Sequence, residues 1–310
     1  MVTALILAVL AVLLAWPVPL WLDRQKWMWA NPFAAMVIWQ TVAVAGMFSL
    51  LGAPLAAGLS PLGDTVPVAL RQLLTDTHPP HTLLGLPGNN LVLLVLAALL
   101  AGHLLLTLLV TVMRLQREVN QHKNMVKLLG EQDGNKGTYV LPADQPVAYC
   151  LPGLFQPVTV VSSGLQDQLT EEQYQAVLRH EQAHLRQSHH LLLAAFLTWR
   201  QALPWLPVTE RAQAAVASLV EILADEAVLE SHDRAVLLNA VVAAYPLHQE
   251  NPVTSFVPSV EPEASPVQLS PRLANLVTAP TRSQPLAAAM IATSTLGLLG
   301  VLALLVAGPI

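Results

Sequence analysis

Residues 178–185 read Leu-Arg-His-Glu-Gln-Ala-His-Leu and contain the pattern His-Glu-x-x-His. Residues four apart lie one turn apart on one face of an α-helix, so His180 and His184 can present two imidazole nitrogens to one Zn²⁺. Glu181 lies beside them and can take a proton from the attacking water and return it to the leaving amine. The pattern therefore predicts hydrolysis assisted by a Zn²⁺ cofactor, with Glu181 as the general base.

The residues around this pattern predict that it lies within a helix. Thr170 and Gln173 fit a capping box, in which each side chain bonds the backbone N–H of the other residue. Apolar residues then recur at helical spacing, namely Tyr174, Val177, Leu178 and Leu185. Pro204 and Pro207 are expected to break the helix that follows His184.

A second predicted helix, between Thr209 and Glu230, offers a third metal ligand. Glu221 and Asp225 are four residues apart and share a face, so one can bind the metal while the other holds a ligand imidazole. Two His and one carboxylate leave the fourth position of zinc open, as in catalytic rather than structural sites. The alternative is that these residues are ordinary solvated side chains on exposed helix faces.

The composition is typical of a membrane protein. The chain is 54% hydrophobic and 11% charged, with a mean hydropathy of +0.52. Its net charge of -5 argues against direct binding of nucleic acid by bulk electrostatic attraction. The single cysteine, Cys150, excludes an internal disulfide and a metal cluster held by thiolates.

Four apolar stretches are long enough to cross a bilayer, namely residues 3–22, 33–59, 91–115 and 286–307. Pro17 and Pro19 interrupt the first stretch, and Pro54 lies in the second. No basic residue precedes the first stretch, so we expect a retained helix rather than a secretory signal peptide. Residues 1–115 thus form a three-span unit, in which a loop at 60–90 joins the second and third spans.

Basic residues set the expected orientation of the spans. Arg24 and Lys26 follow the first span, and Arg114, Arg117 and Lys123 follow the third. The positive-inside rule places both regions in the cytoplasm, with both termini and the 60–90 loop outside.

Residues 116–251 form the predicted cytoplasmic domain. Three segments are typical of strands, namely Thr138–Leu141, Val147–Cys150 and Val158–Val161, and a Ser-Ser-Gly turn signal follows them. An edge strand beside the metal-binding helix can hold an extended peptide substrate. Residues 252–285, rich in Pro and Ser, are expected to form an irregular linker. The predicted fold class is therefore a mainly α membrane protein with four transmembrane helices and an α+β zinc-metallopeptidase domain inserted between the third and fourth.

The sequence leaves the roles of five further histidines open. His78 and His81 lie in the 60–90 loop, where a solvated loop competes with metal binding. His103 lies within the third span, where a functional role competes with a hydrogen bond to a neighbouring helix carbonyl or to Gln40. His189 and His190 are expected to be solvated residues near a helix end. The oxyanion-stabilising residue cannot be assigned from spacing.

These features together resemble the BlaR/MecR antirepressors, integral-membrane zinc metallopeptidases of bacterial β-lactam resistance. The resemblance rests on the approach Leu-Thr-Glu-Glu-Gln-Tyr-Gln-Ala-Val-Leu before His180, the continuation Ala-His-Leu-Arg, and Glu221-x-x-x-Asp225. It implies a multi-pass protein of the bacterial cell membrane, with His180, His184 and Glu221 as zinc ligands and Glu181 as general base. It also implies that the substrate is a cytoplasmic transcriptional repressor.

Two features differ from that family. The sequence ends at Ile310, so we expect no penicillin-binding sensor domain, and no sensing of β-lactams by acylation. Relatives commonly carry an Asp where His189 and His190 stand, which leaves the groups around the ligand imidazoles undetermined.

Two classes of function are therefore compared. The first is a membrane zinc endopeptidase acting on a regulatory protein, with a quality-control protease or a protease with intramembrane catalysis as variants. The second is a signalling or scaffold protein whose zinc domain binds a partner without turnover. Glu181 favours the enzyme, because binding alone needs no base. The protein contacts membrane lipid in either case, and the sequence leaves homo-oligomer formation open.

Overall fold

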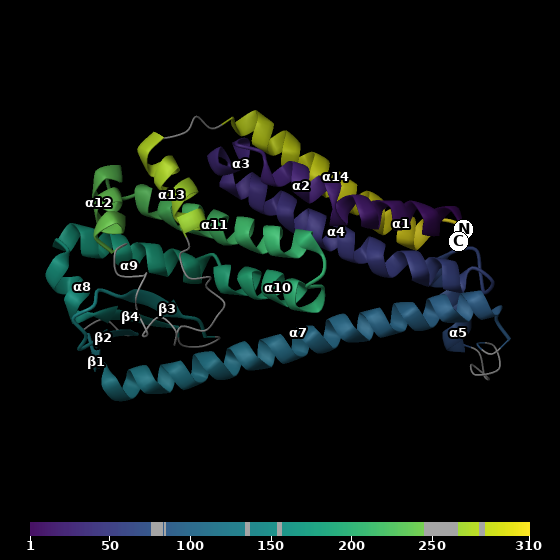
Figure 1. Ribbon diagram of the computed structural model, residues 1–310, viewed down its shortest axis with the longest axis horizontal. Helices are drawn as coiled ribbons and strands as arrows, with labels where there is room; N and C mark the ends of the chain where they lie inside the picture. The colour runs from purple at the N-terminus through teal and green to yellow at the C-terminus, as the bar shows by residue number, and fades with distance from the viewer. Residues whose placement is uncertain (76–82, 84, 134–136, 154–156, 245–265, 279–282) are drawn as a thin grey trace. The chain divides into compact units, whose positions relative to one another are not determined.

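The computed structural model describes residues 1–75, 83, 85–133, 137–153, 157–244, 266–278 and 283–310 (Figure 1). His78 and His81 lie outside the described residues. The chain divides into two compact units. Unit 1 comprises residues 1–107, 199–212 and 283–310, and unit 2 comprises residues 108–198 and 213–282.

Among the described residues, four helical segments are long and apolar enough to cross a membrane, as the predicted fold class requires. They are Val2–Asp23, Pro32–Leu59, Gly88–Leu129 and Gln284–Ala307. The first consists of α1 (Val2–Ala15) and α2 (Pro17–Asp23), which are separated at Trp16 because Pro17 cannot continue a regular helix. The second, α4 (Pro32–Leu59), follows the short α3 (Trp27–Ala30) and retains Pro54 in its interior.

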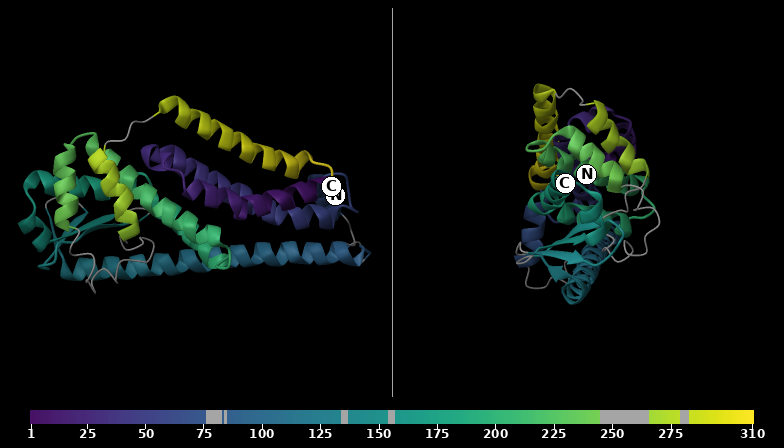
Figure 2. Two further views of the ribbon diagram at one scale, coloured as in Figure 1. Left: turned by 45° about the horizontal axis from the view of Figure 1, so that its top comes forward. Right: turned by 90° about the vertical axis from the view of Figure 1, so that its left-hand side faces the viewer.

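Within unit 1, α1 and α14 (Gln284–Ala307) both pack against α4 (Figure 2). Leu7, Ala45 and Val301 form the centre of this contact. Gly52 permits the close approach of α14, since a Cβ at this position would collide with Leu305. Thr3 donates a hydrogen bond to the carbonyl of Pro309, so the two ends of the chain lie together, in agreement with an even number of alternating spans.

The region predicted as the 60–90 loop contains a helix, α5 (Val66–Thr75). The third span also differs from expectation, because α7 (Gly88–Leu129) continues well past Leu115. His103 bonds a neighbouring helix carbonyl, as one of the two interpretations expected. Its Nε2 lies 2.9 Å from the carbonyl oxygen of Ala202, which accepts the hydrogen bond.

Unit 2 contains a four-stranded sheet in the order β1-β2-β4-β3. The strands are β1 (Glu131–Gln132), β2 (Thr138–Leu141), β3 (Ala148–Leu151) and β4 (Val158–Ser162). β4 runs parallel to β2 and antiparallel to β3, so β3 is an edge strand. Every residue of β4 is buried. Val160 packs with Val126 of α7, and Val161 packs with Leu178 of α9.

The helices of unit 2 follow the sheet. They are α8 (Ser163–Gln168), α9 (Glu171–Arg186), α10 (His189–Ala202), α11 (Pro207–Leu229), α12 (Arg234–Ala244) and α13 (Pro266–Thr278); α10 and α11 pass into unit 1 at residues 199–212. The expected Ser-Ser-Gly turn is the start of α8, where Ser162 caps the helix by accepting a hydrogen bond from the N–H of Leu165. Gly164 is required there because a Cβ would collide with the backbone of Asp144.

The prolines between α10 and α11 act partly as predicted. The helix α10 ends at Ala202, just before Pro204, but a further break at Gln187 and Ser188 separates it from α9, and Pro207 begins α11 instead of ending a helix. The segment 252–285 is not irregular throughout, because residues 266–278 form α13. Leu276 of α13 is buried against Ala176, Val228 and Leu237, so this helix belongs to the core of unit 2.

Candidate metal centre

The helix α9 carries three of the predicted site residues. Its N-terminus has the predicted capping box, in which the Thr170 hydroxyl accepts from the N–H of Gln173 and the Gln173 side chain accepts from the N–H of Thr170. His180 and His184 follow about three and about four turns later and are only 6% and 7% exposed. The interpretation of these imidazoles as solvated surface groups is therefore wrong.

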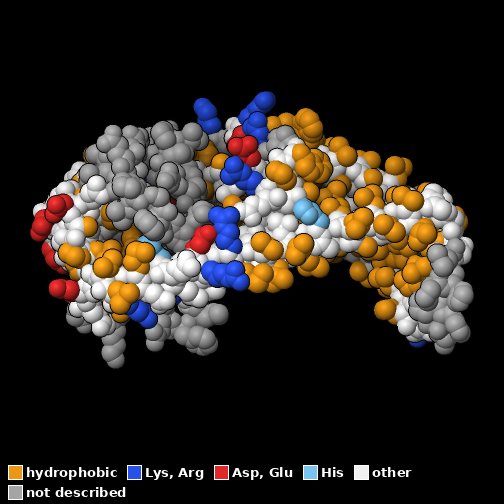
Figure 3. Space-filling view, turned by 60° about the horizontal axis from the view of Figure 1, so that its bottom comes forward, with side chains coloured by type: hydrophobic (Ala, Val, Ile, Leu, Met, Phe, Trp, Pro, Cys, Tyr) orange, Lys and Arg blue, Asp and Glu red, His pale blue; other side chains and the backbone are white. Residues whose placement is uncertain are grey.

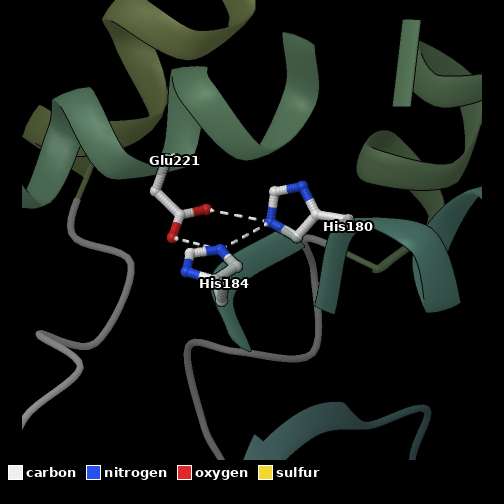
Figure 4. A group of neighbouring side chains, drawn as sticks. All are labelled: His180, His184 and Glu221. Atoms are coloured by element: carbon white, nitrogen blue, oxygen red, sulfur yellow. Dashed lines mark hydrogen bonds and ion pairs between the residues drawn. The ribbon is translucent and has the colours of Figure 1, made fainter. Parts of the chain in front are cut away.

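The helix α11 places Glu221 opposite both imidazoles (Figure 4). The Nε2 atoms of His180 and His184 lie 3.2 Å apart, and each lies 3.4 Å from an oxygen of Glu221. Ligand bonds of about 2.0–2.1 Å in a tetrahedral zinc site place neighbouring ligand atoms roughly 3.3 Å apart. The three donor atoms therefore have the spacing that one zinc ion requires, with a fourth position left for substrate or water.

Asp225 lies one turn after Glu221 and holds the outer nitrogen of His180. The distance from His180 Nδ1 to Asp225 Oδ1 is 3.0 Å, and Asp225 is 3% exposed. A proton on Nδ1 that is donated to Asp225 leaves the lone pair of Nε2 directed at the metal position. Of the two arrangements that spacing allowed for Glu221 and Asp225, the geometry fits Glu221 as ligand and Asp225 as the group that orients an imidazole.

His184 has a different partner, His189, which is 3% exposed instead of solvated as expected. Ser188 adopts φ 54°, a left-handed conformation that ends α9 and turns the chain so that α10 begins at His189. The Nδ1 atoms of His184 and His189 then lie 3.2 Å apart, and His189 Nε2 lies 3.0 Å from the side-chain oxygen of Gln187.

Arg272 is a site residue that the sequence analysis did not identify. Its Nε and Nη2 donate to the two oxygens of Asp225, both at 2.8 Å, and its Nη1 lies 3.1 Å from Glu221. The helix α13 that carries it is held in place by Arg234, which donates to the carbonyls of Asn275 and Leu276 near the helix end. Residues Leu269, Leu273 and Leu276 recur at helical spacing, and this pattern could have indicated α13.

Glu181 lies on α9 between the two histidines and contacts the edge strand β3. Its carboxylate accepts a hydrogen bond from the backbone N–H of Cys150 in the edge strand β3. Burial raises the pKa of Glu181 to about 7, against the lowering effect of His180. A carboxyl group with this pKa can both accept and release a proton near neutral pH.

The surrounding charges set the ionisation of the three metal-binding groups. Burial acts to raise the pKa of Glu221, but His184, His180 and Arg272 hold it well below its usual range. Burial lowers the pKa of His184 to about 3, so its imidazole is neutral, which is the form that binds metals. Burial and Arg272 act to lower the pKa of His180, but hydrogen bonds to Asp225 and Glu221 raise it to about 10. Metal binding must displace that proton.

The charges of the site balance when zinc is counted. Glu181, Glu221 and Asp225 contribute three negative charges when ionised, and Arg272 contributes one positive charge that the neighbouring carboxylates reinforce by raising its pKa. A divalent cation supplies the remaining two positive charges. The donor set and the charge of the buried cluster both fit Zn²⁺.

Residues 111–245 match the model of a protein family described as peptidase family M48. No curated protein and no solved structure matches the chain. The matched segment contains both α9 and α11, and therefore the whole group formed by His180, His184 and Glu221. It ends before α13, so Arg272 lies outside it.

Proposed function

We propose that the chain is a membrane-embedded zinc endopeptidase that cleaves a cytoplasmic regulatory protein, since residues 111–245 match the model of peptidase family M48 and contain the group formed by His180, His184 and Glu221. The single observation that carries the catalytic part is the convergence of His180, His184 and Glu221 at zinc-ligand spacing, with Glu181 beside them.

Each side chain has a distinct part in the proposed mechanism. His180, His184 and Glu221 hold the zinc ion, which when bound polarises the peptide carbonyl and makes water a better nucleophile. Glu181 takes the proton from the attacking water and gives it to the leaving amine. Asp225 fixes the ring of His180, so that the Nε2 lone pair stays directed at the metal position.

The edge strand β3 supports binding of the substrate as an extended peptide. An edge strand has backbone groups without a partner strand, and an added strand can pair with them. Since Glu181 bonds the N–H of Cys150, this strand passes directly beside the proposed general base. A peptide paired with β3 would run past Glu181, as endopeptidase cleavage requires.

The identity of the substrate as a cytoplasmic regulatory protein rests on other observations than the peptidase activity does. The family match does not distinguish the BlaR/MecR antirepressor subtype, and support comes from the sequence resemblance and from the basic residues after the first and third spans. A transcriptional repressor is the substrate that the resemblance implies. Cleavage would release transcription in response to a signal such as an antibiotic.

The test compares cells that express the full-length wild type with cells that express Glu181→Gln or Gln182→Ala. New protein N-termini are mapped by mass spectrometry, and zinc content is measured on each purified protein. We expect equal zinc in all three proteins, and loss of a defined set of cytoplasmic N-termini with Glu181→Gln alone. In purified form, Glu181→Gln should lower peptide cleavage by about 10²–10⁴-fold.

Other outcomes would change the proposal in specific ways. Unaltered cleavage by Glu181→Gln would disprove the role of Glu181. New N-termini confined to many damaged membrane proteins would indicate quality control, and N-termini on the outer side of the membrane would contradict the proposed orientation.

A further inference from the structure

The connection between α10 and α11 belongs to unit 1, together with the membrane spans. This segment, residues 199–212, is called the hairpin tip below. It contains no charged residue between 201 and 209, and its sequence there is Gln-Ala-Leu-Pro-Trp-Leu-Pro-Val-Thr. A connection inside a soluble domain is normally polar, so this composition needs an explanation.

The partners of the hairpin tip lie deep in the spans. His103 bonds the carbonyl of Ala202 and stands eleven residues before Arg114, the first permanently charged residue of α7. At the rise of an α-helix, this separation places the bond about 16 Å from that charge. Since the hydrocarbon layer of a bilayer is about 30 Å thick, the bond lies near its middle.

A second contact of the hairpin tip indicates the same depth in the bilayer. An apolar cavity of about 200 Å³ is lined by Leu203 and Trp205 of the hairpin tip and by Val12 of α1. Val12 stands eleven residues before Asp23, the first charged residue of the first span. Asp23 in turn pairs with Arg211 at the end of the hairpin tip, at 3.0 Å. The chain thus passes from the charged level at Arg211 to the level of Val12 and His103.

The backbone of the hairpin tip meets the requirement that hydrocarbon imposes. Polar groups of a turn must be bonded internally at this depth. His103 satisfies the Ala202 carbonyl, and Thr209 donates its hydroxyl to the carbonyls of Leu203 and Leu206. Prolines at 204 and 207 remove two N–H donors that would otherwise need partners.

The exposed surface completes the argument. Trp205 is 69% exposed, a value similar to those of Leu105 and Leu106 on the surface of the third span. Figure 3 shows that many hydrophobic side chains are exposed on the face of the protein that it presents. Arg200, the charged residue on the other side of the hairpin tip, has an interaction partner within the protein.

We propose that residues 199–212 form a re-entrant segment, which enters the bilayer from the side of Asp23 and Arg114 and contacts lipid acyl chains through Trp205. The contact surface is hydrocarbon, since the exposed ring lies at the depth of the exposed leucines of the third span. This inference does not depend on the proposed substrate, because it concerns only the membrane unit.

The first test uses the wild-type protein in phosphatidylcholine and phosphatidylglycerol vesicles that contain a lipid with a photoreactive acyl chain. Trypsin cleaves after Arg200 and Arg211, so the peptide 201–211 reports directly on the hairpin tip. We expect lipid adducts on this peptide at a yield similar to that on peptides of the spans. Adducts on the spans without any on 201–211 would overturn the proposal.

The second test measures depth. A nitroxide label is attached to Trp205→Cys in a Cys150→Ala background, and its collisions with oxygen and with a water-soluble nickel chelate are compared. Leu105→Cys is the control in hydrocarbon, and Val242→Cys, an exposed position on α12, is the control in water. We expect position 205 to match 105, with several-fold protection from nickel relative to 242. Accessibility like that of 242 would refute membrane insertion.

Discussion

The Nδ1 atoms of His184 and His189 lie 3.2 Å apart in the buried interior of unit 2, and Gln187 determines which of them donates. The oxygen of Gln187 can only accept, so it takes the proton on His189 Nε2. A neutral His189 then has a bare Nδ1, which accepts from Nδ1 of His184. This series of hydrogen bonds leaves Nε2 of His184 free to bind zinc. His189 thus orients His184 as Asp225 orients His180, but with a neutral side chain instead of a carboxylate.

His189→Ala should therefore weaken zinc binding by about 10–100-fold, the usual cost of removing a group that orients a ligand imidazole. Zinc affinity is measured by competition with a chromophoric chelator. The matched control is His190→Ala, the next residue of the same helix, which removes a second imidazole without removing the 3.2 Å contact between His184 and His189. Equal affinities for the two variants would show that His189 does not orient His184. His189→Asp should retain tight binding, because a carboxylate also accepts from Nδ1.

Arg272→Met should destabilise the zinc-free protein more than the zinc-bound protein. In the zinc-free protein, the substitution removes the guanidinium that pairs with the carboxylates of Glu221 and Asp225. Breaking a buried ion pair of this kind lowers the stability by about 3 kcal/mol. With zinc bound, Glu221 retains a cation. Thermodynamic linkage then requires that the variant binds zinc more tightly than wild type.

The measurement is a set of thermal melts of wild type and variant, with zinc and with a chelator. The chelated variant should melt roughly 6–12 °C below the chelated wild type for a domain of this size. Arg186→Met, which removes an exposed positive charge from α9, should change the melting temperature little. A larger loss in the zinc-bound state than in the chelated state would contradict the charge balance described above.

Local patterns predicted much of this site. The capping box at Thr170 fixes where α9 begins, and the spacing of His180 and His184 then places both imidazoles on one face without information from elsewhere. Glu221 and Asp225 were predicted by the same periodicity on a second helix. Four apolar spans followed from length and hydropathy alone.

The missed residues depend on features that local pattern does not contain. His189 reaches His184 only because Ser188 adopts a left-handed backbone conformation. A serine gives no sequence signal for this conformation, since glycine or asparagine is the usual residue there. Arg272 reaches Asp225 across 47 residues, and its approach depends on α13 packing against α9, α11 and α12. The proline and serine residues of the segment 252–285 indicated a linker, so the core helix α13 within it was not predicted.

Thr170→Ala should lower the stability of the catalytic unit by about 1 kcal/mol, because the N–H of Gln173 loses its acceptor. Thr170→Gly should lower the stability by only roughly a few tenths of a kcal/mol, since glycine exposes the helix terminus to water. Thermal melts with a chelator present measure both, and Gln175→Ala on the exposed face of α9 is the control. Equal losses for the Ala and Gly variants would show that the hydroxyl does not cap the helix.

Removal of zinc should destabilise unit 2 selectively. A metal that binds only the folded state stabilises it by about 2.7 kcal/mol when its free concentration is 100 times Kd. Hydrogen exchange in the presence of a chelator should therefore accelerate in α9 and α11, whereas the α1, α4 and α14 cluster of unit 1 should keep its protection. His184→Ala provides the control, since a variant that lacks a ligand should exchange at the chelated rate with or without added zinc. If the chelator changed the exchange of the spans as strongly as that of α9, zinc would stabilise more than the site formed by His180, His184 and Glu221.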